Sequence, residues 1–111
     1  QAYLVDFQEA SGNFCTFDLV FMFAIFWTPE QRHEDEREMR LLRHYYDVLC
    51  QNGVTGYTWE NLTEDYRLML ALIVFFPIFD AISGAGYDYW WPKMQCLVAN
   101  FHDLDCWALF D

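Results

Sequence analysis

Two aspartates near the start of the chain, Asp6 and Asp18, stand where a carboxylate can take part in chemistry. Asp6 ends a short apolar run, and Asp18 follows twelve residues later at the head of a second apolar run. The first run is typical of a buried strand with an acid at its tip, and the second of a helix with an acid in its first turn. A carboxylate held on a rigid strand end can bind Mg²⁺ beside a phosphate. The residues alone leave a second interpretation open, in which Asp6 is an ordinary acid that ends a strand.

The same aspartates belong to a longer pattern that resembles a family of small-molecule kinases. It is similar to the segment after the catalytic loop in aminoglycoside-phosphotransferase-like kinases, and most similar to their ecdysteroid-kinase-like (choline-kinase-like) branch. The resemblance covers roughly residues 3–75. It implies a mainly α fold, the helical C-lobe portion of a protein-kinase-like fold with one short N-terminal strand. The segments that carry it are, in order, Asp6-Phe7-Gln8, Gly12, Asp18-Leu19, Tyr45–Leu49, Gly53–Leu62 and Asp65-Tyr66-Arg67.

The resemblance implies a role for each aspartate. Asp6 matches the metal-binding aspartate that orients Mg²⁺ against the ATP phosphates, and Asp18 matches the aspartate that braces the catalytic loop. The implied reaction is ATP-dependent phosphotransfer, in which a kinase moves the γ-phosphoryl group of ATP to a hydroxyl of a small-molecule acceptor. Such a transferase also needs a phosphate-covering loop, a lysine, a catalytic base and a second metal ligand. The chain has no Gly-x-Gly-x-x-Gly, no Gly-Lys-Ser/Thr, and no His-x-Asp with a following Asn.

We therefore expect residues 1–111 to form a partial kinase-like C-terminal lobe that lacks the N-lobe and the catalytic loop. On this interpretation ATP and Mg²⁺ bind in the complete parent protein, the missing N-terminal lobe is a partner, and the isolated chain is inactive. Asp6 is the predicted metal ligand, and no catalytic residue or other cofactor-binding residue is predicted within the chain. The alternative is a non-catalytic helical interaction module or a degenerate kinase remnant.

Composition narrows the class of protein further. The formal net charge of −11 argues against a nucleic-acid partner, because phosphate backbones bind basic surfaces. Hydrophobic residues make up 55% of the chain, more than so short a soluble domain covers easily, which favours a piece with faces for neighbours. The longest uncharged apolar run, Leu68–Phe79, is shorter than the roughly 20 residues of a membrane span. The four cysteines are scattered, which is typical of a reducing, cytoplasmic location.

The elements that must position these residues are expected to be helices after a strand over residues 2–6. Thr16 or Asp18 is expected to cap a helix that runs through Phe26 and is buried because it is apolar on nearly all sides. Thr28 and Pro29 predict the start of a helix that continues to about Cys50. Its acidic stretch, residues 34–38, is interpreted as a solvated helix face rather than a surface for a cationic substrate.

The second half of the chain is expected to hold further helices. Thr58 is predicted to cap a short turn, and Thr63 a longer helix that reaches about Phe76. Pro77 is predicted to end or kink that helix, and Pro92 to lie in the first turn of a helix that ends near Phe101. A short helix is predicted over residues 104–110. Most of the large aromatic residues are interpreted as core, and a cage for a quaternary ammonium group is the alternative. The candidates for that cage are Trp59, Trp90, Trp91, Trp107, Tyr57, Tyr87 and Tyr89.

Overall fold

The structure is a computed structural model that describes residues 15–111, and every regular element within them is a helix. The mainly α fold predicted from the sequence is therefore confirmed for this range. The predicted strand and Asp6 lie outside the described residues. The elements are α1 (Thr16–Phe26), α2 (Pro29–His33), the 3₁₀ helix η1 (Glu34–Glu36), α3 (Arg37–Gln51), α4 (Trp59–Ile73), α5 (Phe75–Ile82), α6 (Tyr87–Asp103) and the 3₁₀ helix η2 (Cys106–Phe110).

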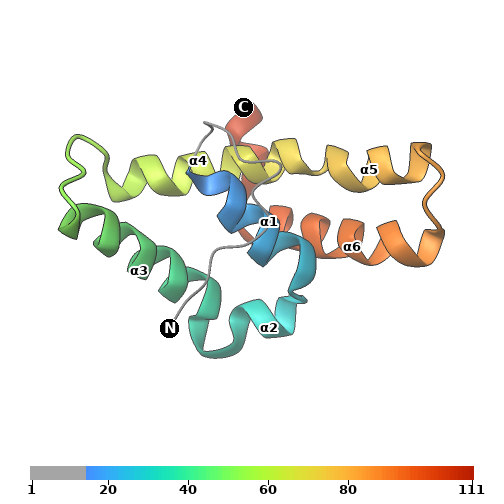
Figure 1. Cartoon of the computed structure of the whole chain (residues 1–111), viewed down its shortest axis with the longest axis horizontal. Coiled ribbons are helices and arrows are strands. Elements are labelled where there is room, and N and C mark those ends of the chain that lie inside the picture. Colours follow the sequence, from blue (N-terminus) through green and yellow to red (C-terminus); the bar gives the residue numbers. More distant parts are fainter. Residues whose placement is uncertain (1–14) are drawn as a thin grey trace.

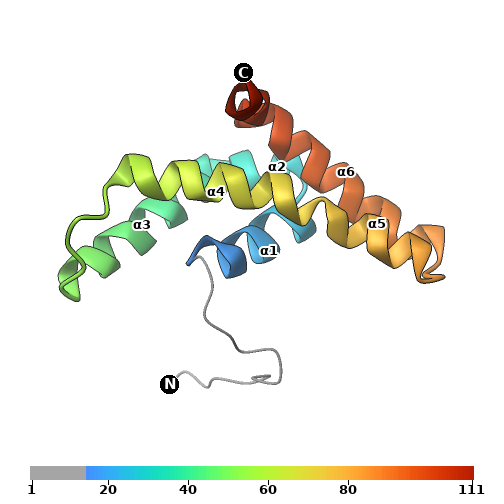
Figure 2. The same cartoon turned by 90° about the horizontal axis from the view of Figure 1, so that it is seen from above.

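Two helical hairpins extend from a central helix. Figure 1 shows α3 and α4 as one hairpin and α5 and α6 as the other, reaching toward opposite ends of the molecule with α1 between them. Seen from above, α4 and α5 follow one another almost in line, while the C-terminal half of α6 diverges from α5 (Figure 2). This layout makes α1 the element on which both hairpins converge.

The core forms where α1 packs against α4 and α6. Val20 and Phe23 of α1 are 0% and 3% exposed, and they share the core cluster with Leu70 of α4 and Leu97 of α6. The opposite face of α1 is open, with Phe26 57% exposed. The predicted helix is therefore central, but it is buried along one face rather than all round.

The expected single helix from Pro29 to Cys50 is wrong, because the chain breaks at η1. Its start is confirmed: the Thr28 hydroxyl accepts from the Gln31 N–H, and the Gln31 side chain accepts from the Thr28 N–H. At the break, Asp35 and Glu36 both have φ of 52°. This left-handed conformation costs roughly 1–2 kcal/mol for each non-glycine residue. The chain then restarts as α3, and Gly53, with φ of 89°, follows its end in the left-handed conformation that glycine adopts readily.

Two predicted caps are also wrong. The residue before α1 is Cys15, and Thr16 donates its hydroxyl to the Asp65 carbonyl of α4 instead of capping its own helix. In α4, Thr58 begins one continuous helix through a capping box with Asn61. Thr63 lies inside that helix, where its hydroxyl donates to the Glu60 carbonyl. The two short helical pieces expected here are therefore a single helix.

The two prolines shape the second hairpin. Pro77 has no N–H to donate to the carbonyl of Ile73, and the helix breaks at Val74, between α4 and α5, as predicted. Pro92 lies inside α6, which begins at Tyr87, earlier than expected. The predicted short helix near the end is the 3₁₀ helix η2. None of the helices in residues 15–111 is both long enough and apolar enough to cross a bilayer.

The capping box of α4 gives a direct test of this fold. Thr58→Ala removes the side-chain acceptor for the Asn61 N–H, so we expect the free energy of unfolding to fall by about 1 kcal/mol. Thr63→Ala is the matched control, and it should change stability by less than about 0.5 kcal/mol because this threonine lies in the helix interior. Thermal unfolding followed by circular dichroism measures both. A larger loss for Thr63→Ala would mean that α4 begins at the later threonine.

Candidate functional site

A buried polar cluster joins four helices at the junction of α2, α3, α4 and α6. We call it the Arg32–Glu38 cluster. One oxygen of the Glu38 carboxylate accepts from the Tyr66 hydroxyl and from the Asn100 amide, both at 2.7 Å. Its other oxygen lies 3.6 Å from Nη1 of Arg32. The members are Arg32, His33, Glu38, Tyr66, Asn100 and Asp103.

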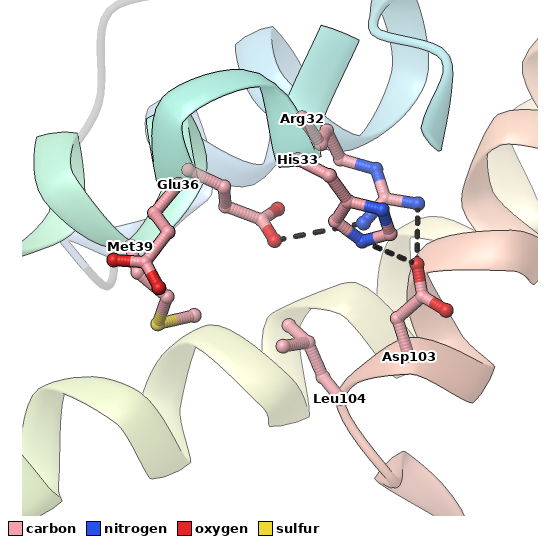
Figure 3. A pocket seen from close by; sticks show the side chains of 7 residues that line it. Arg32, His33, Glu36, Met39, Asp103 and Leu104 are labelled. Atoms are coloured by element: carbon pink, nitrogen blue, oxygen red, sulfur yellow. Dashed lines mark hydrogen bonds and ion pairs between the residues drawn. The ribbon is translucent and has the colours of Figure 1, made fainter. Parts of the chain in front are cut away.

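Asp103 closes the cluster at its solvent edge. Nη2 of Arg32 donates to Oδ2 of Asp103 at 2.9 Å, and Nε2 of His33 lies 3.1 Å from the same oxygen. Figure 3 shows Arg32 and His33 of α2 pointing toward Asp103 at the end of α6. The Arg32 side chain is fully buried, whereas His33 is exposed. The carboxylate thus joins a buried cation to an imidazole that solvent reaches.

The cluster leaves some buried hydrogen-bonding capacity unused. Nε and Nη1 of Arg32 and Oδ1 of Asn100 have no hydrogen-bond partner among the described residues. A buried polar group without a partner costs roughly 1–3 kcal/mol, more when it is charged. These atoms therefore mark the position where a water molecule or a small polar group would stabilise the protein.

A cavity of about 310 Å³ opens beside the cluster. Glu36 and Met39 line one side of it and Asp103 and Leu104 the other (Figure 3). Its volume is at the lower end of the range for small-molecule sites, roughly 300–1,000 Å³. The lining combines carboxylates with Arg32, His33 and apolar side chains, a composition that suits a small polar ligand with an apolar body. Within residues 15–111 no group of three or more His, Cys, Asp or Glu side chains is arranged to hold a metal ion.

Burial changes the acid–base chemistry of one member of the cluster. Loss of solvent and then the Glu38 carboxylate raise the pKa of Tyr66 well above its ordinary value near 10. The tyrosine is therefore a fixed hydrogen-bond donor to Glu38 at neutral pH and not a proton-transfer group. The pair His33–Asp103 is the part of the cluster that solvent reaches.

The structure describes some of the residues that the sequence singled out and not others. Asp18 is exposed in the first turn of α1, where its charge favours the helix dipole, and the described residues do not test its predicted role as a brace. Asp6 lies in residues 1–14, outside the described range. Of the acidic stretch, Glu34, Asp35 and Glu36 are exposed as expected. The prediction was wrong for Glu38, which is only 4% exposed, because it faces the protein interior.

Helical spacing carried a signal for the residues that sequence reasoning missed. Glu38 stands four residues before Leu42, which is 0% exposed, so both lie on the same face of α3. Asn100 likewise stands three residues after the buried Leu97 of α6. A polar residue in register with the buried face of its helix needs a partner inside the protein.

The aromatic residues do not gather into one cage. Trp59 packs against Tyr46 at the α3–α4 end, with a ring-centroid distance of 5.9 Å. Trp107 packs against Phe101 near the C-terminus at 5.0 Å. Tyr87, Trp90 and Trp91 come together on α6, where they pack against one another at ring-centroid distances of 5.3–5.9 Å. The cage alternative is therefore not supported for these side chains.

The buried ion pair gives the second prediction. Glu38→Leu leaves the Arg32 guanidinium buried with less compensation, so the free energy of unfolding should fall by about 3–5 kcal/mol. The double variant Arg32→Met/Glu38→Leu should recover much of that loss, because it removes both buried charges. Glu34→Leu is the control, since Glu34 is exposed and pairs with Arg37 at the surface. Urea denaturation measures all three, and equal effects at positions 38 and 34 would show that the cluster is not formed.

Tyr66 gives a prediction for alkaline pH. Because the pKa of Tyr66 is raised by folding, the unfolded chain loses this proton first as pH rises, and stability then falls. The contribution of Tyr66 to the free energy of unfolding is fully present below about pH 10 and decreases above it. Tyr66→Phe should flatten the decline in unfolding free energy between about pH 9 and 11 relative to the unmutated chain. An unchanged slope would place Tyr66 in solvent.

Comparison with known proteins gives one match. The sequence profile of the DUF1679 family, described as "uncharacterized oxidoreductase dhs-27", matches residues 2–85. No curated protein and no solved structure matches the chain. The matched range includes Asp6, Asp18 and every helix from α1 to α5, while Asn100 and Asp103 of the Arg32–Glu38 cluster, on α6, follow it. Because the profile covers most of its length, the chain belongs to the DUF1679 family.

Proposed function

We propose that this chain is the C-terminal portion of an ATP-dependent small-molecule phosphotransferase. The observation that carries the proposal is the order of the segments Asp6-Phe7-Gln8, Asp18-Leu19 and Gly53–Leu62, which all fall within the residues matched by the family. Each resembles the corresponding segment of ecdysteroid-kinase-like and choline-kinase-like proteins. The helical body formed by residues 15–111 is of the kind that such a C-terminal lobe requires.

The family's printed description uses the word oxidoreductase, and the chain supports that chemistry less well. A dinucleotide-binding site uses a strand, a Gly-x-Gly-x-x-Gly turn and a helix. The nearest pattern here is Gly84-Ala85-Gly86, which joins α5 to α6 and has Tyr89 where the third glycine would stand. We therefore base the proposed function on phosphotransfer.

In this proposal Asp6 contributes one ligand to Mg²⁺ bound with ATP. Mg²⁺ prefers octahedral oxygen coordination, with a few ligands from protein and the rest from phosphate and water. Residues 15–111 do not form a magnesium site of their own, because they hold no group of three or more His, Cys, Asp or Glu side chains arranged around a metal ion. The second protein ligand, the base and the phosphate-binding lysine would come from the missing N-terminal lobe and the catalytic loop.

The open face of α1 suits such a neighbour. Phe21, Met22 and Phe26 are exposed on it, at 37%, 51% and 57%. Covering these side chains would remove apolar surface from water, which is worth about 25 cal/mol for each Å².

The cavity beside the Arg32–Glu38 cluster is our candidate for the acceptor pocket. Three carboxylates, of Glu36, Glu38 and Asp103, line it against the one guanidinium of Arg32, and the chain as a whole carries a charge of −11. An acceptor that bears an amine beside its hydroxyl is therefore favoured over one that bears a carboxylate. Met39 and Leu104 would contact the apolar part of the acceptor.

The second candidate function is a non-catalytic helical interaction module. The many exposed apolar side chains favour it, because patches of this kind are typical of interfaces. A degenerate kinase remnant would keep the helices and lose the catalytic groups. The two candidates differ in whether Asp6 takes part in binding Mg²⁺ and ATP.

Asp6→Asn in the full-length protein tests the proposed function. We expect this variant to lose the rise in melting temperature that Mg²⁺ with ATP produces, and to lose turnover, because the amide carries no charge for the metal. Asp47→Asn is the matched control, since Asp47 is exposed on α3 and pairs with Arg43 at the surface. The measurements are thermal unfolding with ATP in the presence and absence of Mg²⁺, and ATP consumption with a panel of amino alcohols.

Equal Mg²⁺-dependent shifts for the two variants would contradict the role of Asp6. No shift in the unmutated full-length protein would favour the interaction module. The isolated 111-residue chain should not hydrolyse ATP, since it carries at most one of the required ligands. Hydrolysis by the purified chain that Asp6→Asn abolishes would show that the segment is catalytic by itself.

A further inference from the structure

The hairpin of α5 and α6 carries an exposed apolar stripe with no covering element among the described residues. Phe75, Phe79 and Ile82 recur at helical spacing on α5 and are 62%, 68% and 79% exposed. Tyr87, just across the turn on α6, is 62% exposed and stacks on Trp91. Figures 1 and 2 both show this hairpin reaching away from the body of the molecule. We call these five side chains the hairpin patch.

On the side where α5 and α6 face each other, the side chains already have partners within the hairpin. Pro77 of α5 is buried, and Lys93 of α6 lies 3.4 Å from the Asp80 carboxylate of α5. The Lys93 ammonium also sits 3.8 Å from the ring of Tyr89, which adds a cation–π contact. The two helices therefore hold each other, and the hairpin patch faces away from that contact as a separate surface.

The charge of the hairpin differs from that of the rest of the chain. Between residues 68 and 101 the only charged side chains are Asp80, Asp88 and Lys93, a net charge of −1 against −11 for the whole chain. Two copies that met through any acidic surface would repel each other. The hairpin is therefore a part of the described chain where two identical copies can approach with little electrostatic cost.

The size of the patch matches what a dimer needs. An aromatic side chain buries roughly 150–250 Å² when it is fully covered. With the exposed fractions above and that of Trp91, 37%, the five side chains of the hairpin patch offer about 450–750 Å² to a partner. A standard interface buries about 800 Å² on each side.

We propose that the hairpin patch binds the same patch of a second copy, so that this chain forms a two-fold symmetric dimer through α5 and α6. A two-fold interface needs a surface that complements itself, and an apolar stripe with almost no net charge meets that requirement. A lipid surface is the other possible occupant of a Trp- and Tyr-bearing hairpin. The chain's strong negative charge disfavours it, since anionic membranes attract basic segments.

Sedimentation equilibrium of the 111-residue chain tests the dimer. We expect a dimer at concentrations of about 10–100 µM, with a dissociation constant that rises at least about tenfold in Phe79→Ser/Ile82→Ser. Phe110→Ser is the matched control, because Phe110 is 66% exposed on η2, away from the hairpin, and its loss should leave the dimer intact. Circular dichroism checks that each variant keeps its helices. Added salt should leave the association unchanged or strengthen it, since it screens the repulsion between two acidic chains.

Three results would overturn the proposal. The first is a chain that stays monomeric at about 100 µM. The second is a dimer that Phe110→Ser weakens as much as the hairpin variant does, which would indicate non-specific apolar association. The third is a chain that is monomeric in solution but binds phosphatidylcholine vesicles through Phe79 and Ile82, which would identify a lipid surface as the occupant. None of these results depends on Asp6, so the dimer can be contradicted without contradicting the proposed phosphotransfer, and the phosphotransfer without contradicting the dimer.

Discussion

The arrangement of the helices depends on the hydrogen bonds and the ion pair that the buried Glu38 carboxylate makes. In a continuous helix from Pro29 to Cys50, Arg32 and Glu38 would lie about 9 Å apart along the axis and about 120° apart around it. The break at η1 removes this separation and lets both side chains point into the junction with α4 and α6. The carboxylate then accepts from Tyr66 and Asn100 as well. A single buried charge therefore fixes the relative positions of four helices.

The left-handed pair Asp35 and Glu36 follows from this constraint. Each residue costs roughly 1–2 kcal/mol in that conformation, and neither is a glycine. A buried carboxylate without partners would cost more than both together. The strained turn is thus the less costly solution, because it supplies Glu38 with a cation and two hydrogen-bond donors. The same turn places Glu36 at the wall of the cavity, so that the geometry of the candidate acceptor pocket derives from the packing of the core.

Local signals in the sequence predicted much of this fold, and long-range contacts account for what was missed. Thr28 with Gln31, Gly53 and Pro77 act within a few residues, and each marks a helix end or a break in the structure. The break at η1 depends on Tyr66 and Asn100, which lie 28 and 62 residues from Glu38 along the chain. The expected cap at Thr16 failed for the same reason, since its hydroxyl binds a carbonyl of α4. Of the candidate site, Glu38 and Asn100 were within reach of helical periodicity, but the pairing between them, 62 residues apart in the chain, was not. The predicted roles of Asp6 and Asp18 rest on resemblance, and no contact within residues 15–111 tests them.

Stability alone does not explain why charged side chains are buried in the Arg32–Glu38 cluster. Well-packed apolar side chains in place of a buried ion pair often give equal or greater stability. An apolar junction, however, would tolerate several registers of α2 and α3 against α6, because hydrophobic contacts are not directional. The carboxylate at position 38 accepts from fixed donors on α4 and α6, and Arg32 must reach both Glu38 and Asp103. These conditions are met in one arrangement. We therefore infer that the buried charges select the break in the chain and the cavity beside it, while the apolar contacts of α1 supply most of the stability.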